Sequence, residues 1–194
     1  GDGAFESVTG LGNVDGEGED VPSNPVQLNV LGINGVVQIV DYLPDGSNGW
    51  YGIGDDHSNL IGWTQAIHWL PVVEISRSAH NNTIRIDGAT QTLSVEQNGI
   101  IALQAPCSLD PDTKPGIYFL EHHKPGGTYT PTEYSEIFYG APWQLHFGGV
   151  GELTGVYWHN QFGKALQGPA VQVSPLLARW LYSSADTGDQ MIVA

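Results

Sequence analysis

Basic residues are scarce in this chain of 194 residues. Six Lys and Arg stand against 21 Asp and Glu, which gives a formal net charge of −15. Because nucleic-acid phosphates and anionic lipid headgroups attract basic surfaces, this balance excludes nucleic acid as a partner. The single cysteine, Cys107, cannot form an internal disulfide, so cysteine usage does not indicate a compartment. No apolar run approaches the roughly 18 to 20 residues that span a bilayer, so we expect no membrane insertion.

Long helices are also excluded, because the chain carries 26 glycines and 12 prolines. We therefore predict an all-β fold, mainly strands with one short helix in the C-terminal region. That helix is expected to start near Ser174, a good N-cap, with Pro175 at its first position and an apolar run reaching Leu181.

The most informative segment is residues 155–175, which read GVYWHNQFGKALQGPAVQVSP. It resembles the signature of the L,D-transpeptidase (YkuD-type) family, in which H-G-x-x-W-H-x-x-F-G precedes S-H-G-C-V-x-(L/V)-S. In that family the cysteine is the nucleophile and the histidine is its base. The residues that match are Gly155, Tyr157, Trp158, His159, Asn160, Phe162, Gly163, Val171, Val173, Ser174 and Pro175.

The reactive positions of that signature do not match. The family's Ser-His-Gly-Cys falls on Gln167, Gly168, Pro169 and Ala170, and the histidine of its upstream His-Gly pair falls on Thr154. Acyl transfer needs a thiolate activated by a nearby base, and a donor for the oxyanion. Ala170 has no sulfur, Gly168 no base and Pro169 no backbone N–H. The resemblance therefore implies a pseudoenzyme with no catalytic residues and no cofactor.

Other blocks extend the likeness. Residues 84–100 read as two alternating strands around a turn, and residues 114–120 and 142–147 look like further strands of the family. The resemblance covers residues 80–194 and implies an L,D-transpeptidase-like β-sandwich.

A weaker resemblance covers residues 26–72. The segments GWYGI at 49–53 and IGWT at 61–64 are similar to strands of bacterial SH3-like domains. Independently, residues 36–40 read as a strand and 44–46 as a turn. We expect a small SH3-like barrel at 26–74, ahead of the degenerate transpeptidase-like domain at 80–194.

Residues 1–25 form an acidic, glycine-rich arm. Their composition is typical of a flexible tail. Alternatively the arm lies along another subunit by β-strand addition, with Phe5, Val8 and Leu11 as anchors. Calcium binding by residues 15–20 is a further alternative, although their spacing matches no complete loop motif. Residue 1 is glycine rather than methionine, so we expect a processed chain, and the resemblance implies an exported bacterial protein outside the cell.

Histidines give no clear metal site. His122 and His123 are adjacent, so on a strand they face opposite sides and cannot both bind one metal without a bend. His146 and His159 could form a zinc pair only with a third ligand. We predict no metal.

Aromatic residues of the retained frame outline a possible groove. Most of the chain's Trp and Tyr residues should be core, but some are expected to line a cleft or an interface. The residues assigned to this vestigial groove are Trp143, Tyr157, Trp158 and His159.

Three functions follow. The favoured one is a non-catalytic structural protein, a self-assembling subunit of an extracellular filament, sheath or surface layer. The alternative is a cell-wall module that holds peptidoglycan stem peptides in the vestigial cleft. The third is an enzyme that uses Ser174 or Cys107 as an unconventional nucleophile.

Overall fold

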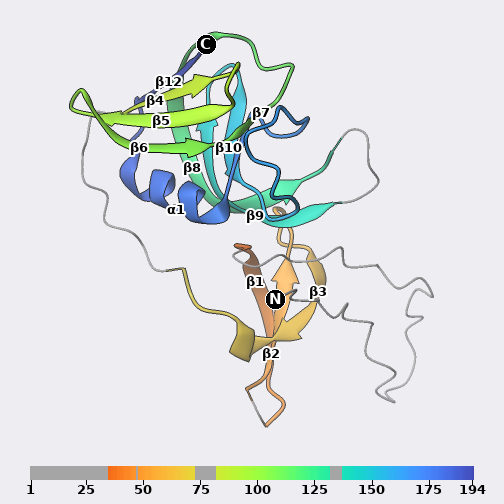
Figure 1. Ribbon diagram of the computed structural model, residues 1–194. Helices are drawn as coiled ribbons and strands as arrows, with labels where there is room; N and C mark the ends of the chain where they lie inside the picture. The colour runs from red at the N-terminus through yellow and green to blue at the C-terminus, as the bar shows by residue number, and fades with distance from the viewer. Residues whose placement is uncertain (1–34, 47, 73–81, 132–136) are drawn as a thin grey trace.

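The computed structural model describes residues 35–46, 48–72, 82–131 and 137–194 (Figure 1). The predicted anchors Phe5, Val8 and Leu11 lie outside these residues. The described chain is mainly β-sheet with one short α-helix, as predicted. It forms one sheet of three strands and one of nine.

The three-stranded sheet is antiparallel, in the order β1-β2-β3. Its strands are β1 (Gln38–Leu43), β2 (Trp50–Gly54) and β3 (Leu60–Gln65), followed by the 3-10 helix η1 (Ala66–His68). Across the described residues this sheet is not closed into a barrel. The SH3-like assignment of residues 26–74 therefore stays a prediction.

The nine-stranded sheet has the order β6-β5-β4-β12-β8-β9-β10-β11-β7. Strand β8 bends it into two layers, because residues near its start pair with β12 and later residues pair with β9. The elements are β4 (Asn82–Asp87), β5 (Thr92–Gln97), β6 (Ile100–Pro106), β7 (Ser108–Leu109), β8 (Gly116–Tyr129), β9 (Phe138–Phe147), β10 (Gly151–Gly155), β11 (Val171–Val173), α1 (Pro175–Ser184) and β12 (Gln190–Val193).

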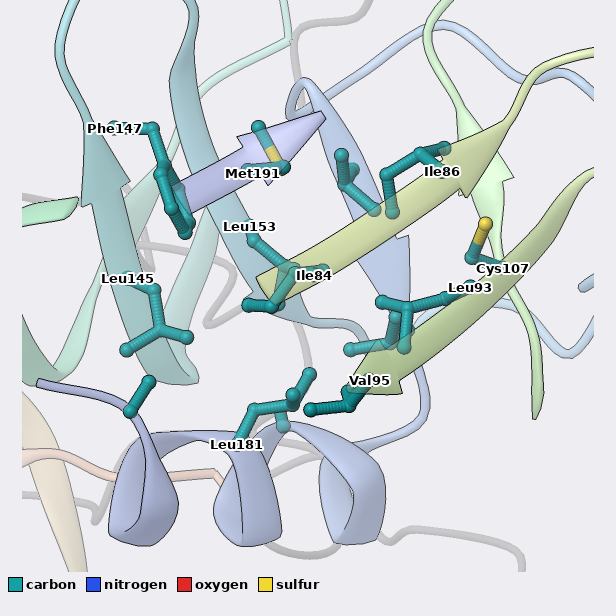
Figure 2. Packing of buried hydrophobic residues seen from close by; sticks show 14 of the residues in the cluster. Ile84, Ile86, Leu93, Val95, Cys107, Leu145, Phe147, Leu153, Leu181 and Met191 are labelled. Atoms are coloured by element: carbon teal, nitrogen blue, oxygen red, sulfur yellow. The ribbon is translucent and has the colours of Figure 1, made fainter. Parts of the chain in front are cut away.

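The hydrophobic core fills the space between the two layers. Alternate residues of the strands point inward, as in β4, where Ile84 and Ile86 are buried and Arg85 is exposed. Burying each such aliphatic side chain contributes about 1.5–3 kcal/mol. Figure 2 shows the packing of the central members of this cluster: Ile84, Ile86, Leu93, Val95, Cys107, Leu145, Phe147, Leu153, Leu181 and Met191.

Helix α1 begins where the sequence predicts. The Ser174 hydroxyl accepts a hydrogen bond from the Leu177 backbone N–H at 3.3 Å, and Pro175 occupies the first turn. Ala178 and Leu181 are fully buried, and Leu181 points from α1 into the core (Figure 2). The helix approaches β10 closely at Gly155, where a Cβ would lie 2.9 Å from the Ala178 Cβ. A glycine is therefore required there by packing.

The three-stranded unit contacts the larger sheet at two places. The Val36 backbone N–H donates to the Gly140 carbonyl at 2.9 Å, beside Gly126, which has no room for a Cβ against Val36. The second place is the turn between β2 and β3, where Asp56 reaches the side chains of β8. The smaller sheet is thus fixed beside the outer face of β8 and β9.

Candidate functional site

A cavity of about 270 Å³ lies on the face of β8, β9 and β10 that points away from the core. It is lined by Thr154 and Pro169, two of the positions at which this sequence differs from the family signature. Gln144 and His146 of β9 contribute polar side chains because their neighbours Leu145 and Phe147 face the core. Asp56 of the smaller unit also lines it. The cavity therefore occupies the place at which the resemblance puts a catalytic centre.

The segment that would carry the nucleophile is tied down by Asp110. Its carboxylate Oδ2 accepts from the Gly168 backbone N–H at 2.7 Å, and its own N–H donates to the Ala170 carbonyl at 3.1 Å. The Ala170 carbonyl also accepts from the Thr113 hydroxyl at 3.3 Å. Pro169 and Ala170 are buried, whereas Gln167 is exposed. The backbone groups of this segment serve structural hydrogen bonds.

A buried glutamine organises the loop from the other side. Gln172, on β11, is 1% exposed. Its Nε2 donates to the Leu166 carbonyl at 3.0 Å, and its Oε1 lies 2.8 Å from His159 Nε2. The Gln161 backbone N–H donates to His159 Nδ1 at 3.2 Å. Both ring nitrogens of His159 are therefore engaged, with Nε2 as the donor.

Thr154, unlike Gln172 and His159, has a buried polar side-chain atom without a hydrogen-bond partner in the described residues. It is 1% exposed, and its Oγ1 has no hydrogen-bond partner among the described residues. A buried hydroxyl left unpaired costs about 1–3 kcal/mol. Thr154 is also one of the residues that line the cavity.

The two residues considered as unconventional nucleophiles, Cys107 and Ser174, have structural roles. Cys107 is fully buried, and this burial, with a contribution from Asp87, raises the pKa of its thiol to about 12. A thiol with that pKa is almost entirely protonated at neutral pH, so it is a poor nucleophile. The Ser174 hydroxyl caps helix α1, as described above. Neither residue lines the cavity.

The four residues assigned to the vestigial groove do not line the cavity, and each makes its own contacts. Trp143 is buried in the core, 5.1 Å from Tyr182 between ring centroids. Trp158 stacks on Phe138 at 4.5 Å. The Tyr157 hydroxyl donates to the Tyr139 carbonyl at 2.6 Å, and burial raises the pKa of Tyr157. His159 binds Gln172. The cavity lining described above includes none of the four, and the groove remains a prediction.

His122 and His123 face opposite sides of β8, as their adjacency in the sequence predicts. His123 faces α1, where its Nε2 lies 2.9 Å from the Ala185 carbonyl oxygen. His122 faces the opposite side and stacks on His146, with ring centroids 4.5 Å apart. His146, which the sequence paired with His159, therefore lies beside His122. Glu121 completes a group whose ligand atoms all lie within 4.8 Å of one another, and these residues could hold a metal.

Asp56 supplies a charge to the cavity rim. Its carboxylate accepts from Lys124 Nζ at 2.6 Å and from the Thr128 backbone N–H at 3.0 Å. Partial burial opposes ionisation, but these hydrogen bonds and the charge of Lys124 hold the pKa of Asp56 below its ordinary value. Asp56 is therefore ionised at neutral pH.

Sequence reasoning missed Gln172, Asp110 and Asp56. The sequence VQV was the available signal for Gln172. Its two β-branched valines predict a strand, and a glutamine that is buried in such a strand needs hydrogen-bond partners. Asp110 and Asp56 act across long chain separations, and nothing local in the sequence identifies their partners.

No protein-family model matches the sequence, and no curated protein sequence matches it. Solved structures with a similar fold are L,D-transpeptidases. One is an LD transpeptidase in complex with imipenem, with 18% identity and a TM-score of 0.53 over 59% of each chain. Another is the L,D-transpeptidase from Mycobacterium smegmatis, with 19% identity and a TM-score of 0.53 over 59% of each chain.

The C442S mutant of the Enterococcus faecium L,D-transpeptidase is 15% identical with a TM-score of 0.51, over 59% of this chain and 50% of that one. The matches thus span between half and three-fifths of these neighbours. They show that the chain contains an L,D-transpeptidase-like β-sandwich. In the described residues no helix has the length and apolar character needed to cross a bilayer.

Proposed function

We propose that this chain is a non-catalytic structural subunit that associates with copies of itself outside the cell. In this proposal its second domain is a degenerate L,D-transpeptidase domain, and the preceding sheet belongs to an SH3-like domain. Loss of catalysis is supported by Ala170 at the nucleophile position and by the engagement of His159, Ser174 and Cys107 in structural roles. Export is supported by the resemblance to L,D-transpeptidases, which act on peptidoglycan outside the membrane.

The observation that carries self-association is the apolar character of the sheet edges. Strand β6 is the last in its sheet order (Figure 1). Its residues Ile100 and Ile101 are nevertheless 73% and 61% exposed. Strand β1 ends the smaller sheet and exposes Tyr42 and Leu43 to about half. Edge strands of monomeric proteins are normally protected by charge, proline or a bulge. β6 has a one-residue bulge at Ala102 and ends at Pro106, but it carries no charged residue. Exposed apolar edges are suited to strand addition by another copy.

Electron microscopy of the full chain over a range of concentrations tests this proposal. We expect regular polymers in the parent, and dispersed particles after the double substitution Ile100→Lys and Ile101→Lys, because charge on an edge blocks strand pairing. Ile117→Lys is the control: it replaces a similarly exposed isoleucine of β8, which pairs with Ile192 of β12 and does not lie on the last strand of the sheet. Monomers at every concentration would refute self-association, and polymers of the double variant would exclude β6 as the joint.

A second candidate is a module that binds peptidoglycan stem peptides, and the cavity favours it. Thr154 presents a buried unpaired hydroxyl there, and Lys124 and Gln144 offer further donors. Cosedimentation with purified sacculi tests this candidate. Binding should weaken in Thr154→Val, which keeps the volume and removes the hydroxyl. Equal binding of parent and variant would exclude this cavity as the site.

A further inference from the structure

We propose that Glu121, His122 and His146 form a binding site for one zinc ion. The site depends on a β-bulge in β8. Leu120 pairs with Phe147, but the next pair along β9 is His122 with His146, so Glu121 is an extra residue in β8. Bulges redirect side chains. Here the bulge turns the His122 ring onto the same sheet face as His146, and leaves Glu121 beside both.

The three side chains converge. The His122 and His146 rings lie 4.5 Å apart with an angle of 21° between their planes. Glu121 Oε2 lies 3.7 Å from His146 Nε2, and the ligand atoms of all three residues fall within 4.8 Å of one another. Tetrahedral zinc, with bonds of about 2.0–2.1 Å, separates its ligand atoms by about 3.3 Å. Glu121 and His122 are exposed, so their side chains have room to rotate, and zinc binding requires the stacked rings to tilt until their nitrogen lone pairs converge.

The surroundings have features of a built metal site. His146 directs Nδ1 toward Glu152 Oε1 at 3.6 Å, which leaves Nε2 for the metal. Metal-bound histidines commonly donate their other ring N–H to a carboxylate, which orients the ring. His122, His146 and Glu152 are neighbours across three consecutive strands, β8, β9 and β10.

Gly148 provides the space for the third ligand. A Cβ at this position would collide with the Glu121 carboxylate. Two imidazoles and one carboxylate suit zinc, and a net charge of −15 favours cations in general. Three protein ligands leave one coordination position free. His122 and His146 also line the cavity, so that position faces the cavity.

Titration of the full chain with zinc chloride alone, followed by calorimetry, tests the site. We expect one zinc ion per chain. His122→Gln, His146→Gln and Glu121→Gln should each weaken binding at least tenfold. His68→Gln is the matched control, because His68 is an exposed histidine outside the group, and its variant should bind like the parent. Glu152→Gln should weaken binding by about 10-fold or more, as loss of a partner of a ligand does.

Cobalt substitution provides a readout that general destabilisation would not imitate. The cobalt complex of the parent should show the visible absorption of a tetrahedral site, and His146→Gln should lose it. A further variant replaces Asp15, Glu17, Glu19 and Asp20 by the corresponding amides to separate the acidic run from the site. The proposal is overturned if zinc does not bind, if only this acidic-run variant loses binding, or if the three ligand variants bind as the parent does.

Discussion

The His159 imidazole and the Gln172 amide are hydrogen-bonded across the loop that precedes β11, with Nε2 and Oε1 2.8 Å apart. Gln172 Nε2 also donates a hydrogen bond to the Leu166 carbonyl at 3.0 Å, so the same side chain fixes both ends of the loop. His159, which matches a histidine of the family signature, therefore acts as a structural hydrogen-bond donor in this fold.

Replacing Gln172 by leucine should destabilise the fold. Gln172→Leu keeps the volume but removes the acceptor for His159 and the donor for Leu166 in a buried setting. Loss of buried hydrogen-bond partners costs about 1–3 kcal/mol. Urea unfolding should show that decrease in the free energy of unfolding. Gln104→Leu, at an exposed position of β6, serves as the control. Equal stabilities of the two variants would mean that the Gln172 contacts contribute nothing net.

Introducing a thiol at position 170 alone should not permit acylation. Ala170→Cys would place a thiol at a position that is 8% exposed, with Gly168 where the signature has its base. Intact-mass spectrometry after incubation with imipenem, seen in complex with a structurally similar LD transpeptidase, should show no adduct. The unmodified parent mass provides the baseline. An adduct on Ala170→Cys would mean that the cavity activates a thiol without that histidine.

Alkaline pH should reveal the buried thiol. Cys107 has its pKa raised from an ordinary 9.0 to about 12, so the native state keeps a proton that the unfolded chain releases. Below pH 9 both states are protonated and the group contributes no pH dependence. Between pH 9 and 12 stability falls by about 1.4 kcal/mol per pH unit from this group.

The variant Cys107→Ala isolates that contribution. The difference in unfolding free energy between parent and variant should be constant below pH 9 and should shift toward the variant above it. Tyrosines such as Tyr157 are present in both proteins, so their titration cancels. A difference that stays flat up to pH 11 would show that Cys107 reaches solvent in the native state.

The contact between the two units should depend on Asp56. Asp56→Ala removes the acceptor of the Thr128 backbone N–H, so hydrogen exchange at that amide should become faster. The effect on global stability should stay below about 1 kcal/mol, because the Asp56–Lys124 pair is partly exposed. Asp41→Ala, an exposed acidic position on β1, is the control. Unchanged exchange at Thr128 would mean that the contact does not protect it in solution.

Sequence patterns predict most of the secondary structure here, because local rules decide it. Alternating apolar residues identified β4 and β5, and the Ser174–Pro175 pair identified the start of α1. Free cysteine is among the most often buried residue types, and Cys107 follows this rule. The open three-stranded sheet, in contrast, does not show the barrel expected for residues 26–74.

The candidate sites could be predicted only in part. The signature located the segment beside the cavity, since Thr154 and Pro169 line it. The partnership of His122 with His146 depends on the one-residue bulge at Glu121, and a bulge changes which side chains share a face without leaving a mark in local propensity. The link between Asp56 and Lys124 joins residues whose proximity is decided by tertiary packing alone.

Strand β12 has a consequence for the rate of folding. It lies between β4 and the start of β8 within one layer, and beside it Asn82 binds Asp189, 107 residues away along the chain. Closing so long a loop costs entropy before any contact of β12 repays it. Strands β4 to β6 can pair locally within microseconds to milliseconds, but the sandwich is complete only after that distant closure. Refolding should therefore be limited by the docking of β12.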